Sequence, residues 1–363
     1  HMKSFVSTTM FVLVFGRILF LPATIILAFN NNNNNKNNNG DDRSTISRTM
    51  IQSSSYDNRG TLSRTEAKDV YNKFADKDDT VGGNDVVSGY GGPAIKALLA
   101  MAEFDTAHVQ SVIEYGCGQG KLVELVFSKL QQQQQQQRDS DTVDTTTTNN
   151  NNEINMNNNT LSLTWRGIDQ SPKMIDKFLK RNNNGGRNSN NNNNFGLRYC
   201  TGELLESGNP DDVVVRQNND HRYYYDRFVS TYCLDLLSEE DMYKVLDLAE
   251  TCLDPHHGRL LLAGITWGYP ATFFPSRRAG RESDDDNYRP SSNIQTICMT
   301  AIWEMLYTIN RKIVGGCRPQ YLRPYLESKG WTIERIEYTL PNGYPWMSSE
   351  VICARPPVPS SKK

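Results

Sequence analysis

The sequence has little excess charge of either sign. Among its 363 residues, 39 are Lys or Arg and 41 are Asp or Glu, so the formal net charge is −2. A protein whose main partner is nucleic acid needs a broad basic field to neutralise phosphates. We therefore expect no nucleic-acid partner.

The chain also lacks the cysteine and histidine patterns that bind metals. It has only five histidines, and its seven cysteines form no CxxC pair and no metal-like spacing with histidine. An odd, irregular set of cysteines indicates reduced, mostly buried thiols rather than a disulfide framework. We expect no metal site. Cys117 differs from the others because it lies inside a glycine-rich turn.

Several tracts lack the apolar side chains that offset the entropy cost of ordering a chain. They are rich in Asn, Gln or Thr and lie at 30–39, 131–137, 145–159 and 182–194. Without them and the N-terminal leader, about one domain of ordinary size is left. The expected organisation is a folded domain at 66–355, with disordered inserts at 131–160 and 182–194, a cap insert at 267–318 and a disordered tail at 356–363.

The N-terminal region is typical of a targeting leader. Lys3 precedes a largely apolar stretch, 10–29, that is interrupted by Arg17 and Pro22, which predicts a secretory signal peptide or a signal anchor at 1–29. The next segment, 30–65, is low in complexity and contains Ser, Thr and Arg with few acids, as in transit peptides. The pairing resembles the two-part plastid leaders of algae with complex plastids. The alternatives are another secretory compartment, such as the endoplasmic reticulum, and a membrane-associated form; we expect no stable membrane insertion of the mature domain.

From residue 67 onward, strand-like and helix-like segments alternate, which predicts an α/β fold with a mostly parallel sheet. The predicted strands are 111–115, 161–168, 195–200, 225–231, 258–265, 331–338 and 348–354. The predicted helices are 66–76, 93–102, 119–130, 172–181, 239–252, 293–311 and 319–329.

The stretch 112–122, VIEYGCGQGKL, joins the first predicted strand to a helix through three glycines at alternate positions. Glycines there let the backbone approach a ligand that side chains would exclude, and a helix start offers free N–H groups. The turn is therefore a candidate site for a nucleotide-like cofactor.

An acid at the end of the second predicted strand supports this interpretation. Asp169 lies 49 positions after Gly120, and subtracting the 29 residues of 131–159 leaves 20. A spacing of about 20 residues from the glycine turn to such an acid is typical of ribose recognition, because the carboxylate accepts both hydroxyl hydrogens.

Two cofactor classes use this unit. A dinucleotide fingerprint needs a third glycine at relative position 6, where this chain has Lys121. The string EYGCGQG instead resembles the first motif of class I S-adenosylmethionine-dependent methyltransferases, and later segments over roughly 67–355 agree with that family. The resemblance implies a Rossmann-like seven-stranded, mostly parallel sheet with helices on both faces, the last strand antiparallel, and a helical cap.

The resemblance also implies a set of cofactor-binding residues. The glycine turn would lie beneath the methionine and ribose parts of S-adenosylmethionine, with Cys117 presenting its backbone. Glu114 would orient the turn or the amino-acid end of the cofactor; the alternative is a surface acid at the end of a strand. The implied residues are Tyr71, Glu114, Gly116, Cys117, Gly118, Gly120, Asp169, Gln170, Glu203, Leu204 and Thr231.

The sequence contains no decisive catalytic signature, and methyl transfer from a sulfonium needs little beyond alignment, desolvation and sometimes a base. Tyr232 and Asp235 are weak candidates to face the transferred methyl group. The acceptor is expected to be a small or mid-sized organic molecule. The candidate substrate residues are Tyr90, Trp267, Trp303, Tyr307 and Arg318. Alternatively, Trp303 and Tyr307 only pack the cap against the domain.

Two other functions remain open at this stage. An NAD-linked oxidoreductase would use the same strand, turn and helix, although Lys121 argues against it. A cofactor-binding protein without turnover would also lack a catalytic signature.

Overall fold

A computed structural model describes the chain in ten segments. They are 61–77, 92–106, 108–141, 163–184, 197–214, 217–218, 221–222, 224–267, 294–339 and 348–357. All of them belong to one compact unit, residues 51–363. The predicted signal segment at 1–29 and the candidate substrate residue Tyr90 lie outside the described residues.

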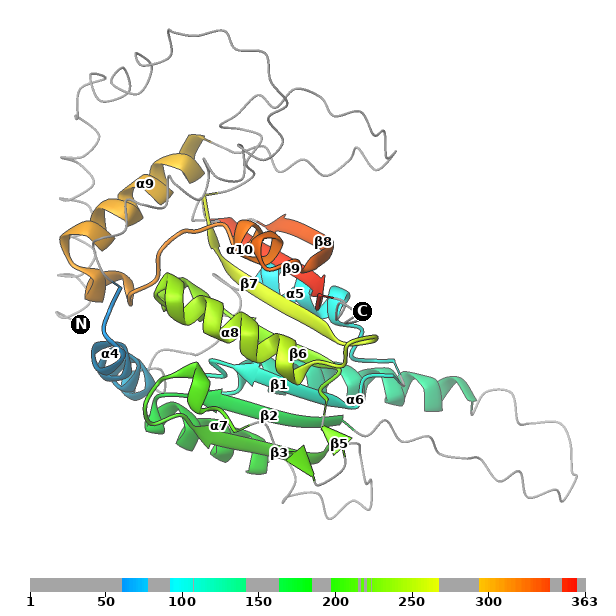
Figure 1. Ribbon diagram of the computed structural model, residues 1–363. Helices are drawn as coiled ribbons and strands as arrows, with labels where there is room; N and C mark the ends of the chain where they lie inside the picture. Colours follow the sequence, from blue (N-terminus) through cyan, green and yellow to red (C-terminus); the bar gives the residue numbers. More distant parts are fainter. Residues whose placement is uncertain are drawn as a thin grey trace, which may run out of the picture. The chain divides into compact units, whose positions relative to one another are not determined.

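The domain is built on a seven-stranded sheet with the strand order β3-β2-β1-β6-β7-β9-β8 (Figure 1). Its strands are β1 (Ser111–Tyr115), β2 (Leu163–Asp169), β3 (Leu197–Leu204), β6 (Arg227–Thr231), β7 (Arg259–Thr266), β8 (Thr332–Thr339) and β9 (Ser348–Arg355). A separate two-stranded pair is formed by β4 (Gln217–Asn218) and β5 (His221–Arg222). All seven predicted strands are confirmed, with ends shifted by a few residues.

The sheet is parallel from β3 to β7, and β1 lies between β2 and β6. The strand order therefore reverses direction next to β1, and ligands of open α/β sheets bind at such a switch point, beyond the carboxyl ends of the strands. The last strand, β9, is antiparallel to both β7 and β8. The predicted Rossmann-like sheet with an antiparallel last strand is confirmed.

Helices cover both faces of the sheet. The α-helices are α4 (Arg64–Lys77), α5 (Gly92–Ala102), α6 (Lys121–Asp141), α7 (Pro172–Asn184), α8 (Glu239–Cys252), α9 (Ile294–Ile309) and α10 (Arg323–Ser328). In Figure 1, α8 crosses in front of the sheet, whereas α5 and α6 lie behind it. The helix and strand alternation predicted from the sequence thus produces a three-layer domain.

Neighbouring side chains of each central strand enter different cores. Val112 packs with α5, α6 and α7 in one cluster, whereas Ile113 packs with α8 and α10 in the other. Both side chains are fully buried. This period of two is expected for a strand that is covered on both faces.

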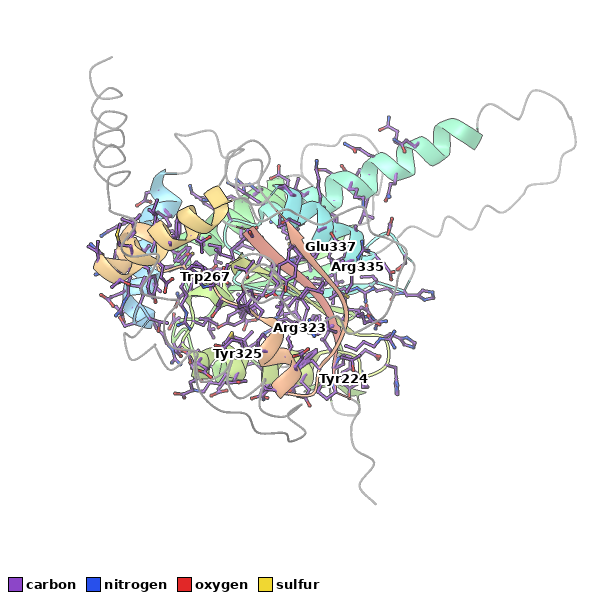
Figure 2. The ribbon with its side chains drawn as sticks, turned by 90° about the horizontal axis from the view of Figure 1, so that it is seen from above. Tyr224, Trp267, Arg323, Tyr325, Arg335 and Glu337 are labelled. Carbon is purple, nitrogen blue, oxygen red and sulfur yellow. The ribbon has the colours of Figure 1, made fainter. Side chains whose placement is uncertain are left out.

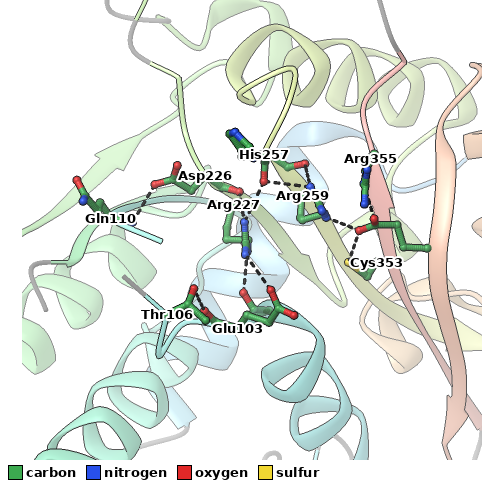
Figure 3. Close-up of polar contacts among 12 residues, drawn as sticks. Glu103, Thr106, Gln110, Asp226, Arg227, His257, Arg259, Cys353 and Arg355 are labelled. Carbon is green, nitrogen blue, oxygen red and sulfur yellow. Dashed lines mark hydrogen bonds and ion pairs between the residues drawn. The ribbon is translucent and has the colours of Figure 1, made fainter. Parts of the chain in front are cut away.

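The edge of the sheet opposite the carboxyl ends of the parallel strands is closed by buried polar contacts (Figure 3). Arg227 is 5% exposed; its Nε donates to the carbonyl oxygen of Ala102 (2.7 Å), and its Nη1 donates to that of Asp226 (2.8 Å). His257 also takes part through its backbone carbonyl, which accepts from Arg227 at 3.3 Å. These contacts satisfy backbone groups at the end of α5 and the start of β6, so this edge has a structural role.

Three predicted boundaries differ from the structure. The insert at 131–160 was expected to be disordered throughout, but α6 continues through the Gln tract to Asp141, because Gln is a good helix former and elongation of an anchored helix is easy. Similarly, α7 extends to Asn184. The folded domain also begins before residue 66: α4 starts at Arg64, and Leu62 is 8% exposed beside Ala67 and Val70.

Within the segments that the structure describes, no helix is both long and apolar enough to span a bilayer.

Candidate functional site

The glycine turn after β1 has a backbone conformation that side chains rarely adopt. Gly116, Gly118 and Gly120 have φ angles of +76°, +53° and +75°. A Cβ atom at Gly116 would lie 2.5 Å from Cys233, and one at Gly120 would lie 2.7 Å from Phe178. At Gly118 a Cβ atom would meet nothing within 4 Å. The turn is therefore packed at both ends and has open space beside its middle residue.

Asp169, the last residue of β2, lies against the middle of this turn. Its Oδ2 accepts a hydrogen bond from the backbone N–H of Gly118 at 3.0 Å, and its Oδ1 accepts one from that of Ser171 at 2.8 Å. Burial raises the pKa of Asp169 to about 6, although these backbone N–H groups act in the opposite direction. The structure thus brings the acid with the corrected spacing of 20 residues into contact with the glycine turn, and its binding to a ribose stays a prediction. The carboxylate is mostly ionised at pH 7, with lone pairs left to accept hydroxyl hydrogens.

Glu114 is buried beneath the turn rather than exposed at its edge. It is 1% exposed, and its Oε2 accepts a hydrogen bond from Nε1 of Trp165 at 2.9 Å. Burial raises its pKa to about 8. The alternative of a surface acid at the end of a strand is therefore wrong, because the neighbouring strand β2 covers this position with Trp165.

Cys117 contributes its backbone to the turn, while its side chain lies in a core. The backbone N–H groups of Gly116 and Cys117 both donate to the carbonyl oxygen of Ile168, at 2.8 and 3.0 Å. The thiol packs close to Gly167, where an added Cβ atom would come within 2.8 Å of the sulfur. Burial raises the pKa of Cys117 well above its usual value, so the thiol is not a nucleophile here.

The residues expected beside an adenine ring lie at the carboxyl ends of β2 and β3. Leu204 pairs with Asp169 in the sheet, and Gln170 follows Asp169. Glu203 is held by Arg166, whose Nη2 lies 2.6 Å from its Oε2 and whose Nε donates to the same oxygen at 2.9 Å. No local pattern in the sequence indicates this ion pair, which competes with the expected contact between Glu203 and an adenine amino group.

Tyr232 follows Thr231, the last residue of β6, at the switch point. Its φ of +52° is unusual for a bulky residue. Its backbone N–H donates to the carbonyl oxygen of Ala263 at 2.7 Å, and its hydroxyl lies 3.0 Å from Oγ of Ser349. Burial raises the pKa of Tyr232, so the phenol is neutral and can donate a hydrogen bond but cannot act as a base near pH 7. Strain of this kind often occurs at functional sites.

The side chain of Asp235, the other candidate to face the transferred methyl group, lies against β7. It is fully buried, and its Oδ2 accepts a hydrogen bond from the backbone N–H of Ile265 at 2.7 Å. Burial raises its pKa to about 8. Asp235 lies in the short 3-10 helix η4 (Leu234–Leu236), which turns its side chain under the end of β7, and its role at the site stays a prediction.

Helix α4 and the cap meet near the carboxyl ends of the strands. The Tyr71 hydroxyl lies 3.8 Å from Sγ of Cys317, and burial raises the pKa of Tyr71, with smaller contributions from Cys317, Cys233 and Asp169. In addition, Oγ of Ser171 donates to Oδ1 of Asn72 at 2.7 Å. These contacts bring Tyr71 to the neighbourhood of Asp169, where a residue covering the cofactor was expected.

The cap residues proposed for substrate contact mostly pack within the protein. Nε1 of Trp303 donates to the carbonyl oxygen of Cys317 at 2.9 Å, and Tyr307 is 4% exposed with Cζ of Arg311 5.9 Å from its ring centre. This geometry favours the packing alternative for both aromatic residues. Arg318 donates to the carbonyl oxygen of Leu237 at 3.5 Å. Trp267 follows β7 and is half-buried (Figure 2).

No group of three or more His, Cys, Asp or Glu residues could hold a metal ion in the described part of the chain. The glycine turn, Asp169, Glu114 and Tyr71 instead form an acidic site with an open backbone surface. Such a site can bind a ligand that carries hydroxyl groups and a positive charge. Two residues that the sequence does not single out also contribute: Trp165 and Arg166 each donate a hydrogen bond to a glutamate on a neighbouring strand.

No protein-family model matches this chain, and no curated protein sequence matches it. Solved structures share its fold at low identity. The N-methyltransferase NodS from Bradyrhizobium japonicum WM9, in complex with S-adenosyl-L-homocysteine, is 10% identical over 79% of this chain and 98% of its own, with a TM-score of 0.44.

Two further structures give similar values. Magnesium protoporphyrin IX methyltransferase (ChlM) from Synechocystis PCC 6803 is 12% identical over 79% of this chain and 99% of its own, with a TM-score of 0.43. The [4+2]-cyclase SpnF is 13% identical over 82% of this chain and 98% of its own, with a TM-score of 0.45.

Proposed function

We propose that this protein is an S-adenosylmethionine-dependent methyltransferase that acts on a small or mid-sized organic acceptor. The observation that carries the proposal is the contact between Asp169 and the backbone of Gly118, at a turn with open space beside it. This contact joins the acid proposed to bind the ribose to the glycine turn, at the switch point of the sheet, where ligands of this fold class bind.

The shape of the turn supports this cofactor over a dinucleotide. In the dinucleotide fingerprint the third glycine, at relative position 6, lets the helix pack closely on the strand. Here Lys121, with its full side chain, occupies position 6 as the first residue of α6, and the glycine at position 5, Gly120, lies against Phe178 of a different helix, α7.

The residues of the site fit the proposed cofactor. Asp169 would accept hydrogen bonds from the ribose hydroxyls, and the turn at Gly118 would allow close backbone approach. Glu114 would lie near the ammonium group at the amino-acid end of the cofactor. When bound, S-adenosylmethionine supplies an electrophilic methyl group. The protein then has to align the acceptor and exclude water, and helix α4 with Tyr71 is placed to contribute to both.

No ionised base is placed at the site among the described residues that were candidates for this role. Tyr232 is neutral and Asp235 is buried under β7. An acceptor that loses its proton readily, or that carries a free lone pair, would need no base. A cofactor-binding protein without turnover is the second candidate, and the same two observations favour it.

We also propose, from the composition of residues 1–65, that the protein follows the secretory route, to a complex plastid or to the endoplasmic reticulum.

Calorimetric titration with S-adenosylmethionine and, separately, with NAD tests the cofactor. Asp169→Ala should weaken binding of S-adenosylmethionine about 100-fold, because two hydrogen bonds to a charged group are lost. Glu239→Ala, on the exposed first turn of α8, is the matched control and should leave affinity unchanged. Binding of NAD alone, or equal affinity in both variants, would refute the assignment.

A screen of extract fractions with methyl-labelled cofactor, followed by mass spectrometry of the product, would identify the acceptor. Labelled product supports the enzyme. Tight cofactor binding with no label transferred in any fraction would favour the protein without turnover.

A further inference from the structure

The Glu114 carboxyl group is fixed in place by an aromatic side chain from the neighbouring strand. Glu114 and Trp165 are each 1% exposed, and the indole Nε1 lies 2.9 Å from Oε2 of Glu114. The indole is itself held by Phe104 and Phe127, whose ring centres lie 5.6 and 6.5 Å away. Because the ring cannot move freely, it sets the direction of the carboxyl group.

This pair lies directly beneath the proposed cofactor site. Glu114 is two positions before Gly116, the first residue of the turn, and it pairs in the sheet with Gly167, two positions before Asp169. A charge that enters the site beside the turn therefore comes close to a carboxyl group that is sealed from water. Charges interact strongly in such surroundings because the effective dielectric constant is low.

The described groups that act on Glu114 include no cation. Asp169 and Trp165 face it from β2, Cys117 from the turn and Cys200 from β3, and burial raises the pKa of both thiols. Burial is also the main cause that raises the pKa of Glu114 to about 8; the indole lowers it and Asp169 raises it further. Without a cationic ligand, the carboxyl group is thus about nine-tenths protonated at pH 7.

We infer that Trp165 is a positioning residue for Glu114, and that this pair couples the binding of a cationic ligand to the release of a proton. The O–H bond of the Glu114 carboxyl group breaks, the proton passes to the solvent, and the carboxylate remains hydrogen-bonded to the indole while it faces the positive charge of the ligand. The inference rests on the proposed function, since S-adenosylmethionine is the cation.

Titration calorimetry at pH 7 in two buffers with different ionisation enthalpies, phosphate and imidazole, measures the protons released. An opposite charge within about 4–6 Å lowers a carboxyl pKa by about 1–3 units. Starting from a pKa of about 8, binding of S-adenosylmethionine without acceptor should therefore release about 0.4 to 0.9 proton. Glu114→Gln should release about 0.1 proton or less, because only Asp169 is left to contribute.

Trp165→Phe removes the indole donor but keeps an aromatic ring. The pKa of Glu114 should then rise by about one unit in both the free and the bound protein. The pH above which affinity levels off should rise by the same amount, and affinity at pH 7 should fall about two- to eightfold. Trp331→Phe is a matched control, because the Trp331 ring is 4% exposed in the other core and its Nε1 has no partner among the described residues. It should change neither quantity. In a Glu114→Gln background, Trp165→Phe should no longer affect the pH dependence.

The outcomes separate this inference from the proposed function. Tight binding with equal apparent enthalpy in both buffers would overturn proton coupling while leaving the cofactor assignment intact. A Trp165→Phe variant that unfolds at lower temperature but keeps the wild-type pH dependence of affinity would show a purely structural role and overturn the positioning role. Absence of binding in every folded variant, judged by circular dichroism, would refute the proposed function itself.

Discussion

Gly118 offers a test in which the cost to folding and the cost to binding can be separated. Its φ of +53° is left-handed, but a Cβ atom there would touch nothing within 4 Å. Gly118→Ala should therefore add only backbone strain to the empty protein. That strain is about 1–2 kcal/mol for a side chain in the left-handed region. For a domain of this size, the melting temperature should fall by about 2–4 °C per kcal/mol.

The same methyl group would occupy the open space where the backbone is expected to approach the cofactor. Gly118→Ala should therefore weaken S-adenosylmethionine binding at least about tenfold, beyond its effect on stability. Gly330→Ala is the matched control: Gly330 has a φ of +77°, and its nearest neighbour for a new Cβ atom is Pro357 at 4.0 Å. It lies between α10 and β8, away from the turn.

Thermal unfolding monitored by circular dichroism and titration calorimetry provide the two measurements. Both variants should lose similar stability, and only Gly118→Ala should lose affinity. Equal affinities in the two variants would refute the idea that the cofactor approaches the turn at Gly118. A loss of affinity in both would mean that left-handed strain acts through global stability.

Further predictions address pH, the inserts and the opposite edge of the sheet. Asp235 has a pKa of about 8 in the folded protein and 3.8 as an unperturbed group, so the stability linked to its protonated form is complete below pH 3.8 and lost as the pH rises through about 8. Asp235→Asn should therefore flatten the fall in the free energy of unfolding, measured with urea, between pH 5 and pH 8. The same variant should leave cofactor affinity unchanged. An unaltered slope would contradict this account of Asp235. Deletion of 142–159, which begins after α6 ends, should leave the dissociation constant for S-adenosylmethionine within about twofold of wild type, because loops between a helix and the following strand lie at the edge opposite the site. A marked loss of affinity would place the insert at the site. Arg227→Met should lower the free energy of unfolding by about 2–4 kcal/mol, because buried carbonyl groups lose their donor, and it should not change cofactor affinity per folded molecule. A free energy of unfolding within about 0.5 kcal/mol of wild type, as is usual for surface substitutions, would argue against a structural role for this edge.

Much of the fold could be predicted because each element carries its own local pattern. Helix α8 has Ser238 as its N-cap, with the side chain accepting from the N–H of Asp241, and buried apolar residues at helical spacing, so its predicted bounds, 239–252, match the structure. The spacing along the chain singled out Asp169 as a site residue, and the structure adds its hydrogen bond to the backbone of the turn. Low complexity predicts disorder from residue 131, whereas the Gln tract extends a helix that is already anchored, so α6 is longer than its predicted range.

The polar partners of the site could not be predicted from local pattern. Arg166 and Glu203 lie 37 positions apart, and Trp165 and Glu114 lie 51 apart. Each pair depends on the register between two strands, which the alternation of apolar residues does not fix across long inserts. The burial of Asp235 depends in the same way on η4 and β7. The sequence identified the residue types at the site, whereas their roles followed from the sheet.

The position of β9 has a consequence for how the protein is made. Seven of its eight residues are buried, and it pairs along its length with both β7 and β8, two strands that leave the ribosome before it. While the chain is being synthesised, β7 has an unpaired edge and β8 has no partner in the sheet. The sheet can close only when residues 348–355 have emerged from the ribosome. A nascent chain or a product truncated before residue 348 would therefore expose the edge of the central sheet and depend on chaperones to avoid aggregation.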